Sequence, residues 1–358
     1  MLLIAAYAVV LLLLDIGLTH LLNYIRPLYA GDVYMEHDIY HHDFRPNVEK
    51  DKSFRQRPYR VFTNSLGFKD QAIRSVDLDR GANRILFMGD SFTEGVAFNY
   101  KKTFVGIIDS ALAHHGVEVL NAGVQSYSPI IYWKKTEYLL DSLRLQFDHM
   151  VLFLDIADAY NEANQYVLTT DNRVLEDKTL AESNDAVSRS TRIKRFVQNR
   201  TTVLYFATNY LYDLAFEKDR NNHWKKIIAL PVSLWTIDNT IYDQWGHQGL
   251  HNMELYMNRL YVLLQGHGVR LTVAVYPWPS QVWHNDLESI QVKYWSNWCA
   301  ERGVDFINYF PDFVSGTADA ETKLATLKRY YLPYDMHFNE RGNQLVAQRF
   351  LEYYATAH

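Results

Sequence analysis

Cysteine is nearly absent from this sequence of 358 residues, in which Cys299 is the only thiol. A single thiol excludes an intrachain disulfide and a cysteine-rich zinc site. Basic blocks are absent too: the 36 Lys and Arg residues are scattered and outnumbered by 41 Asp and Glu residues, for a formal net charge of −5. Because nucleic-acid binding needs a basic patch, we expect no nucleic-acid partner.

The first 25 residues differ in composition from everything that follows. Residues 2–14 are all apolar or Tyr, and the apolar character resumes after Asp15. The length approaches the ~20 residues with which a helix crosses a bilayer. No Lys or Arg precedes the stretch and no small-x-small cleavage site follows it, so a cleaved signal peptide is the poorer interpretation. We expect residues 1–25 to be a transmembrane anchor; Asp15, Thr19 and His20 weaken this prediction, and a buried core helix is the alternative.

After residue 25 the chain changes character twice. Residues 26–83 are polar with little periodicity, and we expect an extended connector there. From residue 84 strand-like and helix-like patterns alternate, which predicts parallel strands joined by right-handed helical crossovers. The expected strands are Arg84–Met88, Val117–Leu120, Met150–Leu154, Leu271–Tyr276 and Val304–Asn308. We therefore expect residues 84–358 to form an α/β three-layer sandwich, flavodoxin-like, around a roughly five-stranded parallel sheet.

The alternating pattern is lost at about residues 161–250, between the third and fourth expected strands. Asp171–Arg200 is charged and indicates a loop, whereas Thr202–Phe216 and Trp224–Trp235 are aromatic-rich and could be helices. An insertion here falls at the carboxyl edge of the sheet, where ligands bind. It could be a lid or substrate platform, a packing appendage or a membrane-facing flap, and the sequence does not choose among them.

Two short motifs supply the parts of a serine hydrolase. Ser91 stands in RILFMGDSFTEG, where a buried strand breaks into a turn, and Asp335 and His337 stand in YDMHFN before the last helical pattern. A hydroxyl attacks an acyl carbon only if a base takes its proton and a third group orients that base. Alone, Gly-Asp-Ser is also an ordinary strand-to-helix connection. Together the motifs predict Ser91 as nucleophile, His337 as base and Asp335 as its partner.

The oxyanion formed by such an attack needs preset donors. The amide of Ser91 at the start of a helix is one candidate. The amide of Gly123 at the end of the second strand is another, because a glycine lets the backbone approach a ligand closely.

The segment GDSF at residues 89–92 with Gly95, then Gly123, then Asp335-Met336-His337, resembles the SGNH (GDSL-like) hydrolase superfamily. The resemblance covers about residues 84–354. It implies that Ser91, His337 and Asp335 are the catalytic triad and that Gly123 is the oxyanion glycine. Members of the family cleave or transfer acyl groups, often acetyl on carbohydrates, and use no metal or cofactor.

The sequence departs from the family pattern in two places. Ala157 stands where the family has an asparagine that donates to the oxyanion, so Asn161 is the candidate replacement, or two backbone amides suffice. Loss of one such donor costs ~10²–10³ in rate. A single residue separates Asp335 from His337, where the commoner form has two. The shorter spacing resembles membrane-associated members that modify exopolysaccharides.

These observations predict a serine esterase that removes an acyl group, most simply O-acetyl, from a cell-surface carbohydrate through an acyl-enzyme. We expect a single-pass membrane protein with its catalytic domain outside the cytoplasm and with exopolysaccharide-synthesis proteins as partners, although the lone Arg26 after the anchor mildly favours a cytoplasmic body. The alternatives are an O-acyltransferase on an exopolysaccharide and a non-catalytic carbohydrate-binding or assembly protein. A lipase acting at the membrane is a weaker one.

Overall fold

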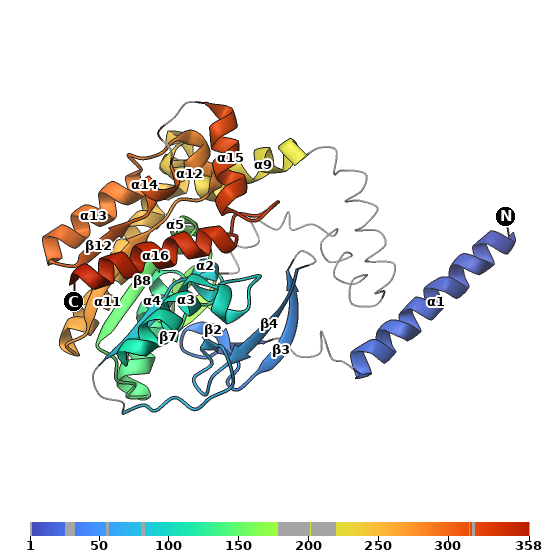
Figure 1. Ribbon diagram of the computed structural model, residues 1–358, viewed down its shortest axis with the longest axis horizontal. Helices are drawn as coiled ribbons and strands as arrows, with labels where there is room; N and C mark the ends of the chain where they lie inside the picture. The colour runs from blue at the N-terminus through green and yellow to red at the C-terminus, as the bar shows by residue number, and fades with distance from the viewer. Residues whose placement is uncertain are drawn as a thin grey trace. The chain divides into compact units, whose positions relative to one another are not determined.

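Figure 1 shows the computed structural model of the chain, which describes residues 2–25, 33–54, 57–79, 83–177, 201, 220–314, 316 and 319–357. The chain divides into two units, residues 1–33 with 179–224 and residues 34–178 with 225–358. The expected helix at 202–216 and most of the expected loop at 171–200 lie outside the described residues.

A helix is present at the N-terminus, where the sequence indicated one. It is α1 (Leu2–Ile25). In its second half the Thr19 hydroxyl donates to Asp15 at 3.5 Å. Among the described residues, no helix combines the length with the apolar character needed to span a bilayer. The transmembrane anchor expected at residues 1–25 stays a prediction.

The five predicted strands are present and pair in parallel. They are β6 (Arg84–Met88), β7 (Glu118–Asn121), β8 (His149–Leu154), β11 (Arg270–Val275) and β12 (Asp305–Asn308). Their order across the sheet is β12-β11-β8-β6-β7, so the first strand of the pattern lies between the second and the third. The residues of β6 and β8 are all buried, as expected for strands covered on both faces. The order reverses at β6, which makes the carboxyl end of β6 the switch point where such sheets bind ligands.

The sheet has eight strands and is mixed, because residues 49–70 add three antiparallel strands beside β7. The three are β3 (Glu49–Phe54), β4 (Arg57–Thr63) and β5 (Lys69–Asp70), and β1 (Tyr34–His37) and β2 (His41–Phe44) form a separate hairpin. These strands lie where the sequence indicated an extended connector. Every residue of β3 is exposed or partly exposed, so the strand carries charged side chains and no hydrophobic alternation that could identify it.

Helices cover the parallel part of the sheet. They include α3 (Phe104–Leu112), α4 (Pro129–Glu137), α5 (Asp158–Asn164), α11 (His247–Gly266), α13 (Ile290–Arg302), α15 (Ala320–Tyr330) and α16 (Glu340–Ala357). Helix α16 packs beside α3, whereas α11 packs beside α4 and α5 (Figure 1). Right-handed crossovers place α3 on one face and α4, α11 and α13 on the other. The expected three-layer sandwich is therefore present around a larger, mixed sheet.

Short elements make up the remaining connections. The helical ones are α2 (Ser91–Glu94), η1 (Tyr100–Lys102), η2 (Ala113–His115), η3 (Tyr138–Ser142), α9 (Arg220–Ile228), η5 (Pro231–Thr236), α10 (Asn239–Ile241), η6 (Tyr242–Gly246), α12 (Pro279–His284) and α14 (Phe310–Phe313). The strands β9 (Tyr166–Leu168) and β10 (Val174–Glu176) form a hairpin within the predicted insertion. The single helix expected at Trp224–Trp235 is two pieces, because Pro231 cannot continue α9 and instead begins η5.

Candidate active site

The strand-to-helix turn after β6 holds Ser91 at the rim of the sheet. Strand β6 ends at Met88 and α2 begins at Ser91. The Asp90 side chain caps this helix by accepting the Phe92 amide at 3.0 Å. Gly89 is required for close packing, because a Cβ there would lie 2.2 Å from Thr93 Oγ1. The GDS sequence thus builds a tight turn that leaves Ser91 partly exposed between buried neighbours.

A short loop between α15 and α16 holds Asp335 and His337, the other two residues of the predicted triad. The amide of Leu332 donates to the His337 carbonyl at 2.8 Å, and Tyr331 forms a β-bridge with Phe338. The Asp335 carboxylate accepts the backbone amide of His337 at 3.1 Å. These bonds close the loop on itself and fix Asp335 and His337 relative to each other.

The structure brings the three predicted catalytic side chains together across 246 residues of sequence. His337 Nε2 lies 2.8 Å from Ser91 Oγ. On the other side of the ring, His337 Nδ1 is hydrogen-bonded to the buried carboxylate of Asp335. This is the arrangement in which a carboxylate holds an imidazole in the tautomer that can take a proton from a serine.

The charges around His337 favour its protonated form. Burial alone would lower its pKa, but the hydrogen bond and charge of Asp335, together with the charges of Asp90 and Asp155, outweigh burial and raise the pKa above its usual value. A raised pKa makes an imidazole a stronger base. The pH must then be higher before the ring is neutral and able to accept a proton.

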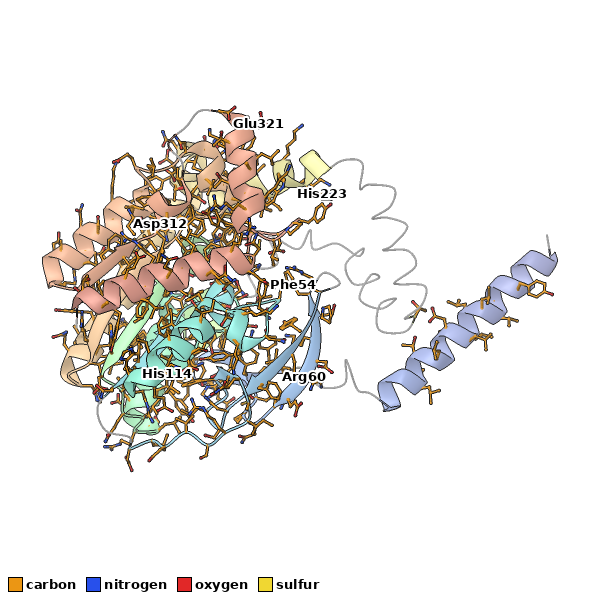
Figure 2. The ribbon with its side chains drawn as sticks, viewed as in Figure 1. Phe54, Arg60, His114, His223, Asp312 and Glu321 are labelled. Atoms are coloured by element: carbon orange, nitrogen blue, oxygen red, sulfur yellow. The ribbon has the colours of Figure 1, made fainter. Side chains whose placement is uncertain are left out.

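Aromatic rings enclose the imidazole. The ring of Phe92 lies 4.8 Å from that of His337, and Phe54 approaches it edge-on at 5.7 Å between centroids. Phe54 lies at the end of the β3–β4 hairpin (Figure 2). The hairpin therefore supplies one wall of the site, which no sequence motif indicated.

A second carboxylate, that of Asp90, contacts Ser91, and sequence reasoning missed it. The Ser91 hydroxyl lies 3.0 Å from Asp90 Oδ2, nearly as close as it lies to His337. Behind Asp90, the Tyr276 hydroxyl lies 3.2 Å from Asp90 Oδ1 and 2.6 Å from Asp155 Oδ2. Asp155 and Tyr276 each directly follow a parallel strand, and this common position was the signal that could have grouped them with Ser91.

The pKa of the Asp155 carboxyl is strongly raised. It accepts the indole N–H of Trp278 at 2.7 Å and the amide of Ala157 at 2.6 Å. Burial, and next the negative charge of Asp90, raise the pKa of the Asp155 carboxyl to about 8. Burial likewise raises the pKa of Asp90. Two buried acids this close are costly to ionise together.

The predicted oxyanion donors have other partners. The Gly123 amide donates to the Asn121 side chain at 3.1 Å, and the Asn161 side chain donates to the Ser126 carbonyl at 3.4 Å. The Ser91 amide is among the donors that stabilise the Asp90 carboxylate. The oxyanion roles of Ser91, Gly123 and Asn161 therefore stay predictions. Within the described residues, no group of three or more His, Cys, Asp or Glu side chains is placed to hold a metal ion.

No family model and no curated protein matches the chain. Among solved structures, the chain is similar to a protein described as lipolytic, of the G-D-S-L family, from Desulfitobacterium hafniense (12% identity, 75% of this chain and 98% of that one, TM-score 0.39). It is also similar to the acetyl xylan esterase AlAXEase (14% identity, 75% and 98%, TM-score 0.41). A third is a catalytic variant of Axe2, an acetylxylan esterase from Geobacillus stearothermophilus (13% identity, 76% and 94%, TM-score 0.39). Membership of this chain in the SGNH superfamily stays a proposal and depends on its own residues.

Proposed function

We propose that this chain is a serine esterase of the SGNH type, with Ser91 as nucleophile, His337 as general base and Asp335 as the residue that orients it. The observation that carries the proposal is the 2.8 Å contact between Ser91 Oγ and His337 Nε2, with the Asp335 carboxylate on the far nitrogen of the same ring. A nucleophile, a base and an orienting acid in series constitute the machinery of acyl transfer.

The reaction follows from this geometry in two steps. His337 Nε2 takes the Ser91 proton as Oγ attacks the ester carbonyl, and the imidazolium then gives that proton to the departing alcohol, which leaves an acyl-enzyme. In the second step His337 takes a proton from water as the water oxygen attacks the acyl carbon; the bond from that carbon to Ser91 Oγ then breaks, the acid is released, and the imidazolium returns the proton to Ser91 Oγ. The Asp335 carboxylate stabilises the imidazolium in both steps.

The substrate class is proposed from the sequence pattern. The single residue between Asp335 and His337 resembles exopolysaccharide-modifying SGNH members, which favours an acyl ester, most simply O-acetyl, on a cell-surface carbohydrate. Placement of the catalytic unit outside the cytoplasm, membrane attachment and a role beside exopolysaccharide-synthesis proteins belong to the same proposal. A C-terminal reporter fusion that is active only inside the cell would contradict the placement.

The test compares the wild-type chain with Ser91→Ala on a short acyl ester such as 4-nitrophenyl acetate, and on a serine-directed fluorophosphonate probe. We expect Ser91→Ala to lose ~10³-fold or more in kcat/KM and to take up no probe, because the nucleophile is gone. Ser110→Ala is the matched control, because it removes a hydroxyl that donates to the Gly106 carbonyl within α3, and it should behave as wild type. Equal turnover by wild type and Ser91→Ala would end the proposal.

An O-acyltransferase is the second candidate, because it uses the same residues and differs only in how water is excluded from the acyl-enzyme. Ala157, which stands at the expected oxyanion position without a side-chain donor, is consistent with a slow hydrolase whose best acceptor is a sugar hydroxyl. Turnover of the acyl donor with and without an oligosaccharide acceptor separates the two activities. A non-catalytic carbohydrate-binding protein would neither turn over esters nor take up the probe.

A further inference from the structure

Two buried carboxyls stand behind the nucleophile, and the proposed esterase mechanism uses neither of them. The side chain of Asp155 is fully buried and Asp90 is 6% exposed. One hydroxyl, that of Tyr276, lies between them, at 3.2 Å from Asp90 and 2.6 Å from Asp155. Tyr276 is itself fully buried, so this group of three has little contact with water.

The Ser91 hydroxyl is in direct contact with this group. It has one hydrogen and two acceptors within reach, His337 Nε2 at 2.8 Å and Asp90 Oδ2 at 3.0 Å. Only the bond to His337 leads to catalysis, because the base must take that hydrogen. An ionised Asp90 competes for the hydrogen as an acceptor, whereas a protonated Asp90 can donate its own hydrogen to Ser91 Oγ and leave the serine hydrogen for His337.

The groups around Asp90 and Asp155 favour a single proton shared by the two carboxyls. Burial raises the pKa of both acids, and the negative charge of Asp90 raises the pKa of Asp155 further. The titratable groups that face the pair from the packed elements are His337 before α16, Asp158 on α5, Tyr132 on α4 and Tyr276 after β11. Of these only His337 carries positive charge when protonated, and Asp335 already pairs with it. Two negative charges on Asp90 and Asp155 would therefore be poorly compensated.

We propose that Asp90 and Asp155, bridged by Tyr276, hold one proton between them and that this proton directs the Ser91 hydroxyl toward His337. The inference rests on the proposed esterase function and adds a control on the same site. Asp90 is a positioning residue in this scheme, since it acts through Ser91 and touches no reacting atom of the substrate. At alkaline pH the pair loses its proton, the ionised Asp90 competes for the serine hydrogen, and the reactivity of Ser91 falls.

The experiment measures the rate at which a fluorophosphonate probe labels Ser91 as a function of pH, in the full chain. Asp90→Asn is the decisive variant, because its amide oxygen can still accept the Phe92 amide while its NH₂ group donates to Ser91 Oγ at every pH. The labelling rate of wild type should rise as His337 loses its proton and then fall at alkaline pH, about tenfold for each pH unit above the pKa of the shared proton, because each such unit removes about nine-tenths of the protonated form. The descending limb should be absent in Asp90→Asn.

Asp109→Asn is the matched control, since Asp109 is a largely buried acid of raised pKa on α3 that is hydrogen-bonded to Tyr100, away from Ser91. It should keep the wild-type descending limb. Tyr276→Phe is a second variant in case Asp90→Asn folds poorly. It removes the Tyr276 hydroxyl, whose hydrogen bond lowers the pKa of Asp155. The descending limb of the labelling rate should therefore move to higher pH. Thermal unfolding verifies that each variant is folded.

The outcomes separate this inference from the function it rests on. A wild-type rate without a descending limb, or the same limb in wild type and Asp90→Asn, overturns the inference while the esterase proposal stands. A folded Asp90→Asn that takes up no probe overturns it as well, because the carboxylate itself would then be required. If wild type reacts no faster than Ser91→Ala, the esterase proposal fails and this inference falls with it.

Discussion

At the scale of single residues, the site is arranged around the hydrogen of the Ser91 hydroxyl. The Ser91 hydroxyl is held between the imidazole of His337 and the carboxyl of Asp90. Asp335 holds the imidazole from its far side and is one of the charges that raise the pKa of His337. The rate of acyl transfer should therefore depend on pH through His337, which must be neutral to act as a base.

Replacement of Asp335 by asparagine tests this dependence. The variant removes the charge and hydrogen bond that raise the pKa of His337, so that pKa falls and the rising limb of kcat/KM against pH moves to lower pH. The value of kcat should fall by about 10²–10⁴, because an asparagine no longer enforces the tautomer or stabilises the imidazolium. A pH profile measured with an acyl ester checks both effects. An unmoved rising limb would contradict the role given to Asp335.

At the scale of elements, the turn after β6 and the turn after β7 are locked together. A Cβ on Gly123 would lie 2.7 Å from Thr93 Cγ2 and 2.9 Å from the backbone nitrogen of Glu94, both in α2. The Asn121 side chain adds a hydrogen bond to the Thr93 carbonyl at 2.8 Å. The position of Ser91 at the start of α2 therefore depends on the absence of a side chain at residue 123.

Gly123→Ala should displace α2 and with it Ser91. We expect a loss of about 1–3 kcal/mol in the free energy of unfolding, as for overpacking elsewhere, and a reduced kcat. Gly266→Ala is the control, because a Cβ at that helical position meets nothing within 4 Å and should be neutral or slightly stabilising. Chemical denaturation and ester turnover give the two readouts. Equal stability of the two variants would show that the turns are not packed as described.

At the scale of the whole molecule, the site is assembled from distant parts of the sequence. Ser91 follows the central strand, His337 precedes the last helix, and Phe54 comes from a hairpin near the beginning of the second unit. Phe54 packs against Val96, Ala97, Phe98 and Leu332 as well as the His337 ring. The antiparallel extension of the sheet thus brings an early segment against His337, the proposed base.

Phe54→Ala should loosen this contact. Loss of a partly buried aromatic ring costs about 1–2 kcal/mol of stability, and greater freedom of His337 should lower kcat more than it changes KM. Val262→Ala, on an exposed position of α11, is the control for removing an apolar side chain from the surface. Thermal unfolding and steady-state kinetics on a short acyl ester measure the effects. Unchanged kcat in a destabilised variant would show that the hairpin supports the fold but not the base.

The amino-acid sequence by itself determined the local features: the five parallel strands, the turn that presents Ser91, and the motifs that hold the three residues of the proposed triad. Apolar runs, turn glycines and the Asp-x-His spacing are readable because each depends on neighbouring residues. Only the tertiary structure decided the rest. Strand β3 is an edge strand whose charged residues show no hydrophobic alternation, and its pairing depends on β4. The approach of Asp90, Tyr276 and Asp155 depends on the order of the strands, because side chains at the ends of different strands meet only when the sheet places those strands side by side.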